Sequence, residues 1–109
     1  MHRFDGYNLQ ITQGDTLLFT VTLAGRTLPD GTQAVFTVKR RPRDGEKLSE
    51  KRLRVQDGAV RIALTSEDTA LPARSYVWDL RILIPGDAPE VETPMEYAAF
   101  TVLQAVGEV

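Results

Sequence analysis

Few side chains of this 109-residue chain could carry acid–base or nucleophilic chemistry. His2 is the only histidine, so a Ser-His-Asp arrangement would depend on a residue next to the chain start. Chain termini are usually poorly ordered, whereas catalytic side chains are held on rigid elements. We therefore expect no nucleophilic catalysis and predict that the protein is not an enzyme.

Paired carboxylates are a second possible source of catalysis, because two acids flanking a glycosidic bond can hydrolyse it. Glu67 with Asp68 and Glu90 with Glu92 are such pairs. The first pair lies where a helical turn favours acids, and the second alternates along an exposed strand. Nothing in the sequence raises the pKa of one acid above that of its neighbour, so we predict no catalytic residue.

Metal binding would have to rely on oxygen ligands, because the chain has no cysteine for thiolate sites or disulfides. The candidate aspartates lie beside a glycine or in a turn: Asp15, Asp30, Asp44, Asp57 and Asp87. Aspartate favours turns because its side chain bonds the nearby backbone, and no D-x-D-x-D spacing is present. We expect no metal and no cofactor.

Charge is unevenly distributed along the chain, although the net charge at pH 7 is only −2. Residues 39–54 contain eight bases and three acids, and residues 87–109 contain five acids and no base. The basic segment lacks the aromatic side chains that stack on nucleobases, so we do not expect nucleic acid as its partner. It is either a solvated loop and strand edge or a protein contact.

The charged residues of these two segments form the predicted interaction surface. Its members are Lys39, Arg40, Arg41, Arg43, Lys51, Arg52, Arg54, Glu90, Glu92 and Glu96. The basic segment of one copy could meet the acidic segment of the next, giving a head-to-tail contact that closes into a ring. Such association would weaken as salt shortens the screening length below about 10 Å.

Short runs of alternating apolar and polar residues recur along the chain, separated by clusters of glycine, proline and aspartate. The predicted strands are 8–12, 16–23, 33–40, 48–55, 59–64, 75–84, and a final strand of 90–93 and 99–103 interrupted at Pro94. This spacing is typical of an antiparallel sandwich or barrel. The run 48–55 is rich in lysine and arginine, which predicts an edge strand.

One face of the predicted strands carries the large apolar side chains. The rings expected to fill the interior are Phe19, Phe36, Tyr76, Trp78 and Phe100. Tyr76 and Trp78 alternate with aliphatic residues on the same face, so we expect them to be structural core residues rather than an exposed platform. Asp68 is also predicted to be structural, because the Tyr76 hydroxyl can bond back to the turn near it.

The letters SEDTA at 66–70, followed by Y-x-W at 76–78, resemble the corner of immunoglobulin-like domains, in which an edtA motif precedes a tyrosine. This chain has five additional residues, LPARS, before its tyrosine. The resemblance implies an all-β fold. We expect a single domain over residues 1–109, an immunoglobulin-like antiparallel β-sandwich of about seven strands.

A second resemblance extends over most of the chain. The segments ITQGDTLLFTVTL, VFTVKR, YVWDLRI and VETPMEYAAFTVL are similar to small immunoglobulin-like structural proteins of phages and prophages of low-GC Gram-positive bacteria. The matching residues are Gly14, Asp15, Thr16, Phe19, Asp68, Thr69, Leu71, Tyr76, Asp79, Thr93, Pro94, Phe100, Thr101 and Val102. The resemblance implies a virion part in the baseplate, tail or head surface, without enzymatic activity.

We therefore expect a non-enzymatic virion assembly module that forms a homo-oligomer or docks on other virion proteins. With no signal peptide and no apolar run near 18 residues, we expect assembly in the bacterial cytoplasm. We expect no nucleic acid, membrane or small-molecule partner. The alternative is a carbohydrate-binding or adhesin-like module of a bacterial surface protein, with Tyr7 and Tyr97 as its exposed aromatics. A small hydrolase would instead need a concave pocket holding two convergent acids.

Overall fold

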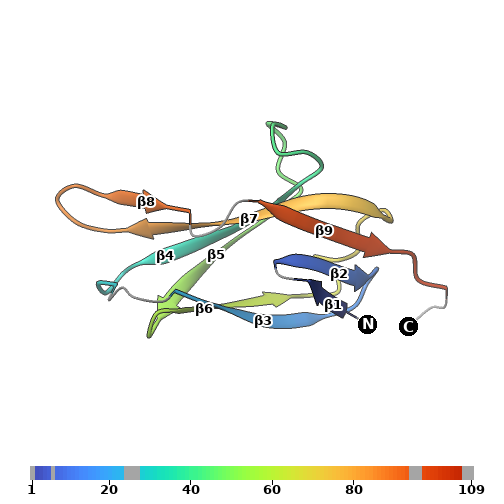
Figure 1. Cartoon of the computed structure of the whole chain (residues 1–109), viewed down its shortest axis with the longest axis horizontal. Coiled ribbons are helices and arrows are strands. Elements are labelled where there is room, and N and C mark those ends of the chain that lie inside the picture. Colours follow the sequence, from blue (N-terminus) through green and yellow to red (C-terminus); the bar gives the residue numbers. More distant parts are fainter. Residues whose placement is uncertain (1, 6, 24–27, 94–96, 107–109) are drawn as a thin grey trace.

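The computed structural model describes residues 2–5, 7–23, 28–93 and 97–106, and all its regular elements within these ranges are β-strands (Figure 1). The strands are β1 His2–Asp5, β2 Asn8–Thr12, β3 Leu17–Thr22, β4 Gln33–Lys39, β5 Ser49–Gln56, β6 Ala59–Leu64, β7 Arg74–Ile84, β8 Glu90–Glu92 and β9 Ala98–Leu103. The all-β prediction is confirmed. In these ranges no helix is long and apolar enough to cross a membrane.

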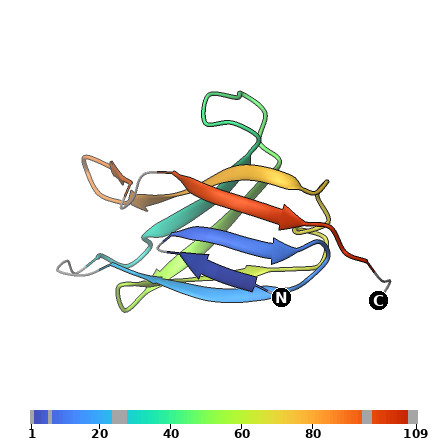
Figure 2. The same ribbon diagram turned by 45° about the vertical axis from the view of Figure 1, so that its right-hand side comes forward.

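The strands form one curled sheet, a half-barrel (Figure 2). Eight of them follow the order β1-β2-β9-β7-β4-β5-β6-β3, and β8 pairs with β7 beside this path. The prediction of a purely antiparallel arrangement is wrong at one place, because β2 runs parallel to β9. Parallel neighbours need a long connection, and here almost the whole chain lies between the two strands.

The strand β5 makes the sheet curl, because it pairs with different neighbours along its length. Its residues 49–54 pair with β4, and only Val55 and Gln56 pair with β6. The strand β5, predicted to be an edge strand, is therefore paired with β4 along one side. Over most of its length its other side faces β6 without pairing with it.

Two differences from the expected strands lie at the ends of the chain. The strand β1 was not predicted; it forms a hairpin with β2 in which Asp5 is opposite Asn8. The predicted final strand consists of two strands, β8 and β9, and both pair with the same long strand β7. Its predicted interruption at Pro94 lies outside the described residues.

The core lies inside the curl and is filled by the inward residues that alternation predicts. Phe36, Tyr76, Trp78 and Phe100 are each no more than 2% exposed, and Phe19 is partly buried against them. The ring of Trp78 lies 5.8 Å from that of Phe19 and 5.5 Å from that of Phe36. The prediction that these five rings fill the interior is confirmed, so little room for chemistry remains there.

One end of the curl is closed by contacts between two segments that carry the family resemblance, Gly14-Asp15 and Thr69. Thr69, which is completely buried, donates its hydroxyl to the Asp15 carbonyl at 2.7 Å. The Gly14 amide in turn donates to the Thr69 carbonyl at 3.3 Å. These bonds satisfy polar groups that would be costly to bury without partners. The Gly14-Asp15 turn and the 65–70 turn therefore hold each other in place.

Candidate interaction surfaces

The predicted basic residues lie on two elements with different surroundings. Lys39 ends β4, and Arg40, Arg41 and Arg43 lie in the loop 40–48, which projects from the sheet (Figure 1). The other three, Lys51, Arg52 and Arg54, lie on β5.

Much of the positive charge in this region is matched by nearby acids. The ion pairs are Arg40 with Glu46 at 3.9 Å, Arg41 with Asp44 at 3.6 Å and Lys47 with Glu50 at 2.6 Å. The hydrogen bond and charge of Lys47 lower the pKa of Glu50. Among the predicted basic residues, those without an ion-pair partner in the part of the chain that the structure describes are Lys39, Arg43, Arg52 and Arg54. These four are the bases most available to a partner protein.

Lys51 faces the other way and has a structural contact. Its ammonium donates to the Asp68 carboxylate at 2.6 Å and to the Ala63 carbonyl of β6 at 2.8 Å. It therefore bridges the open side between β5 and β6, where the strands have separated. The side chains of Lys51 and Asp68 are only 25% and 18% exposed, so water competes weakly for this pair.

Asp68 also caps the turn that follows β6. Its carboxylate accepts the Thr65 amide at 2.7 Å, and the Thr65 hydroxyl accepts the Asp68 amide at 3.3 Å, as in a capping box. Burial of the Asp68 carboxyl acts to raise its pKa, but the hydrogen bonds from Lys51 and Thr65 outweigh this and lower the pKa. Its geometry thus supports the predicted structural role.

Tyr76 and Trp78 fix the loops that leave the core. The Tyr76 hydroxyl donates to the Pro72 carbonyl at 2.6 Å, which closes the corner between the 65–70 turn and β7. The Trp78 indole donates to the Tyr7 carbonyl at 2.9 Å and so anchors the β1–β2 hairpin. Both side chains are buried and hydrogen-bonded, as expected for structural residues.

The acidic segment lies away from the basic loop. Glu90 and Glu92 lie on the exposed strand β8, and Glu96 lies outside the described residues. Lys39 is opposite Val77, whereas Glu90 is opposite Ile84, seven residues further along β7. At roughly 3.3 Å per residue these ends are about 23 Å apart. The separation holds for Lys39 but not for Arg54, which is opposite Gln33 and so lies in the same row of the sheet as Leu83 and Val91.

A shallow hollow of about 410 Å³ lies on the outer face of the sheet between these two ends. Its floor comes from outward residues of β4 and β7, including Val35, Val77 and Leu83. Val91 of β8 and Tyr97 lie at its margin and are 61% and 59% exposed. The lining of the hollow is mixed, because apolar side chains alternate there with charged ones such as Asp79 and Arg81.

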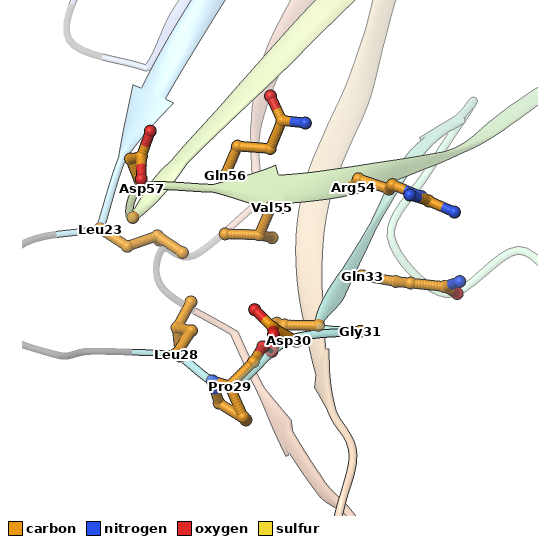
Figure 3. Close-up of a pocket in the computed structure, with 12 residues that line it drawn as sticks. Leu23, Leu28, Pro29, Asp30, Gly31, Gln33, Arg54, Val55, Gln56 and Asp57 are labelled. Atoms are coloured by element: carbon orange, nitrogen blue, oxygen red, sulfur yellow. Dashed lines mark hydrogen bonds between the residues drawn. The ribbon is translucent and has the colours of Figure 1, made fainter.

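A second hollow of about 960 Å³ lies at one end of the curl, between the turn 28–33 and the β5–β6 hairpin. Figure 3 shows Leu23, Leu28 and Val55 pointing toward one another across it. Its two acids do not converge, because the Asp57 carboxylate points away from Asp30. The arrangement expected for a small hydrolase is absent from this hollow.

The two tyrosines considered for ligand binding are exposed at neighbouring positions. Tyr7 is 52% exposed, and its carbonyl accepts the Trp78 indole. Tyr97 precedes Ala98, the residue opposite Trp78 in the sheet. Within the residues that the structure describes, no three histidine or acidic side chains gather as metal ligands.

The chain was compared with known proteins in three ways. No family model matches it, and neither does any curated protein or solved structure.

Proposed function

We propose that the protein is a non-enzymatic virion structural module that acts by self-association or by docking on a larger particle. The observation that carries this proposal is the separation of Lys39, a base without an ion-pair partner, from the acidic strand β8 by about 23 Å along one sheet. Opposite charges at opposite ends cannot neutralise each other within one copy, but they complement each other between copies. The motif resemblance to phage and prophage proteins supports the virion setting.

We also infer that the curled sheet is an immunoglobulin-like sandwich. In this arrangement β3, β6 and the end of β5 face β4, β7, β9 and β2 across the core. The pairings β3–β6 and β4–β7–β9 and the hydrogen bond from Tyr76 to Pro72 support it. A crystal structure with the β3–β6 pair beside, rather than across from, the β4–β7 pair would contradict it.

Sedimentation velocity in low and high salt tests the proposed self-association. We expect the sedimentation coefficient of the wild type to rise with protein concentration in low salt, and to rise less when the screening length falls below about 10 Å. Arg43→Glu reverses an exposed charge at the basic end and should weaken association. Arg61→Glu, an exposed reversal on β6, is the matched control and should leave association unchanged. Equal behaviour of both variants and the wild type would refute the charge-based contact.

A carbohydrate-binding module is the second candidate, because Tyr7 and Tyr97 are exposed and both positions lie beside Trp78. The Tyr7 carbonyl accepts the Trp78 indole, and Tyr97 precedes Ala98, which is opposite Trp78 in the sheet. Stacking on a sugar ring needs such exposed aromatic faces. A glycan array with the wild type and with Tyr97→Ala tests it. Binding that Tyr97→Ala abolishes would favour this function over assembly, and an array without binding would exclude the sugars it contains.

A further inference from the structure

Four consecutive outward residues of β7 place apolar side chains at both ends and a pair of opposite charges between them. They are Val77, Asp79, Arg81 and Leu83, that is, apolar, acidic, basic and apolar. In the part of the chain that the structure describes, neither Asp79 nor Arg81 has an ion-pair partner. A charged pair that is unmatched within its own sheet and flanked by apolar residues suits a contact with another molecule.

The pattern continues across the neighbouring strands. Two adjacent rows cross the sheet: Arg52, Val35 and Arg81 in one, and Glu50, Thr37 and Asp79 in the next. One row therefore carries two bases and the other two acids, of which Glu50 is already paired with Lys47. The two rows are separated along the strands by about 6.7 Å, the rise of two residues.

A second copy of the chain matches these charges only if the two copies are related by a suitable two-fold axis. Consider a two-fold axis that lies in the face, at right angles to the strands, and passes between the two rows. It brings each basic row onto the acidic row of the other copy, so that Arg81 faces Asp79 twice. It also brings Leu83 onto Val77. A two-fold axis parallel to the strands would instead oppose basic rows and cost electrostatic energy.

We propose that a second copy of this chain docks on the outer face of β5, β4 and β7 about this axis, as a face-to-face dimer. The proposal rests on the proposed assembly function, and it names the partner and the surface. The hollow of about 410 Å³ and the exposed Val91 and Tyr97 supply apolar area beside the charged rows. The three strands, at about 4.8 Å each, make the face only about 14 Å wide. We therefore expect a dimer weaker than a standard interface of about 800 Å² per partner.

Charge reversal on β7 provides the test. In Asp79→Arg each contact becomes arginine against arginine, and in Arg81→Asp it becomes aspartate against aspartate. We expect each variant alone to dimerise at least about tenfold more weakly than the wild type in sedimentation equilibrium, which corresponds to about 1.4 kcal/mol. An equimolar mixture of the two variants should recover dimerisation, because one copy then presents only bases and the other only acids.

The double variant with Asp79→Arg and Arg81→Asp is a further check, since it restores opposite charges across the axis and should dimerise like the wild type. Recovery in the mixture also shows that the single variants are folded. Single variants that dimerise as well as the wild type, or a mixture that does not recover, would overturn the face-to-face dimer.

The Arg43→Glu variant separates this inference from the proposed function. If association is lost in Arg43→Glu and kept in Asp79→Arg, the head-to-tail contact stands and the face-to-face dimer is wrong. If the reverse is observed, the face-to-face dimer stands and the head-to-tail contact is wrong. A wild type that remains monomeric would refute both.

Discussion

Replacement of Lys51 by methionine tests the closure of the open side between β5 and β6. The change keeps most of the aliphatic stem but removes an ammonium that bonds Asp68 at 2.6 Å and the Ala63 carbonyl at 2.8 Å. Hydrogen bonds to charged groups contribute about 1.5–3 kcal/mol, and exposed ion pairs about 0–1 kcal/mol. Because this pair is partly shielded, we expect Lys51→Met to lower the free energy of unfolding by about 1–2 kcal/mol at pH 7.

The pH dependence of this loss identifies its cause. The folded-state pKa of Asp68 lies below its ordinary value of 3.8, so its charged form stabilises the fold above that pH. The stabilisation is lost as the pH falls through 3.8 toward the lowered pKa. We therefore expect the difference between the wild type and Lys51→Met to shrink in acid.

Urea unfolding at neutral and acidic pH measures both effects. Lys47→Met is the matched control: its ion pair with Glu50 has the same 2.6 Å separation, but the two side chains are 53% and 31% exposed. Lys47→Met should therefore lower the free energy of unfolding by less than Lys51→Met does. A double-mutant cycle of Lys51→Met with Asp68→Asn isolates the coupling between the two residues. Equal costs for both lysines, or a Lys51→Met loss that is constant down to acidic pH, would refute the reasoning.

Three further predictions concern the scaffold and use thermal or urea unfolding. Tyr76→Phe should lower the free energy of unfolding by about 1 kcal/mol, because it removes one hydrogen bond and little volume. An unchanged stability would contradict a structural role for the hydrogen bond from Tyr76 to Pro72. Gly58→Ala should cost about 1–2 kcal/mol, since φ is 72° and the new Cβ would lie 3.3 Å from the Leu23 carbonyl, whereas Gly45→Ala, in open space, should cost little. Ile62→Ala, at a fully buried position, should cost about 2–5 kcal/mol, and Leu18→Lys, at a position 67% exposed, should be nearly neutral; similar costs would contradict the assigned faces.

Most of the scaffold follows from local pattern in the sequence. Alternation identifies the inward face of β7, and its five predicted core residues are all buried. By the same rule Leu18, which lies between the inward residues Leu17 and Phe19, points outward, and it is 67% exposed. These predictions succeed because the side-chain period of a half-buried strand is two, whatever its neighbours are.

Long-range features could not be predicted in this way. The parallel pairing of β2 with β9 joins the two ends of the chain, and no local signal specifies it. The strand β1 does have a local signal in the sequence, because the dipeptide Asp5-Gly6 favours a tight hairpin turn.

The candidate surfaces show the same division between local and long-range information. Counting charges correctly locates a basic and an acidic segment, but it does not show which bases are already paired. Lys51 belongs to the basic segment in sequence, yet it faces Asp68 on the inner side of β5. Conversely, Asp79 and Arg81 stand outside both segments and become notable only when the register places them beside Glu50, Thr37, Val35 and Arg52.

Sedimentation equilibrium of the unmodified chain in low salt tests the assembly function most directly. At concentrations up to about 1 mM, which detects contacts as weak as about −4 kcal/mol, the account predicts an average mass that rises steadily above that of one copy. An average mass that stays at 12.1 kDa over the whole range would contradict it.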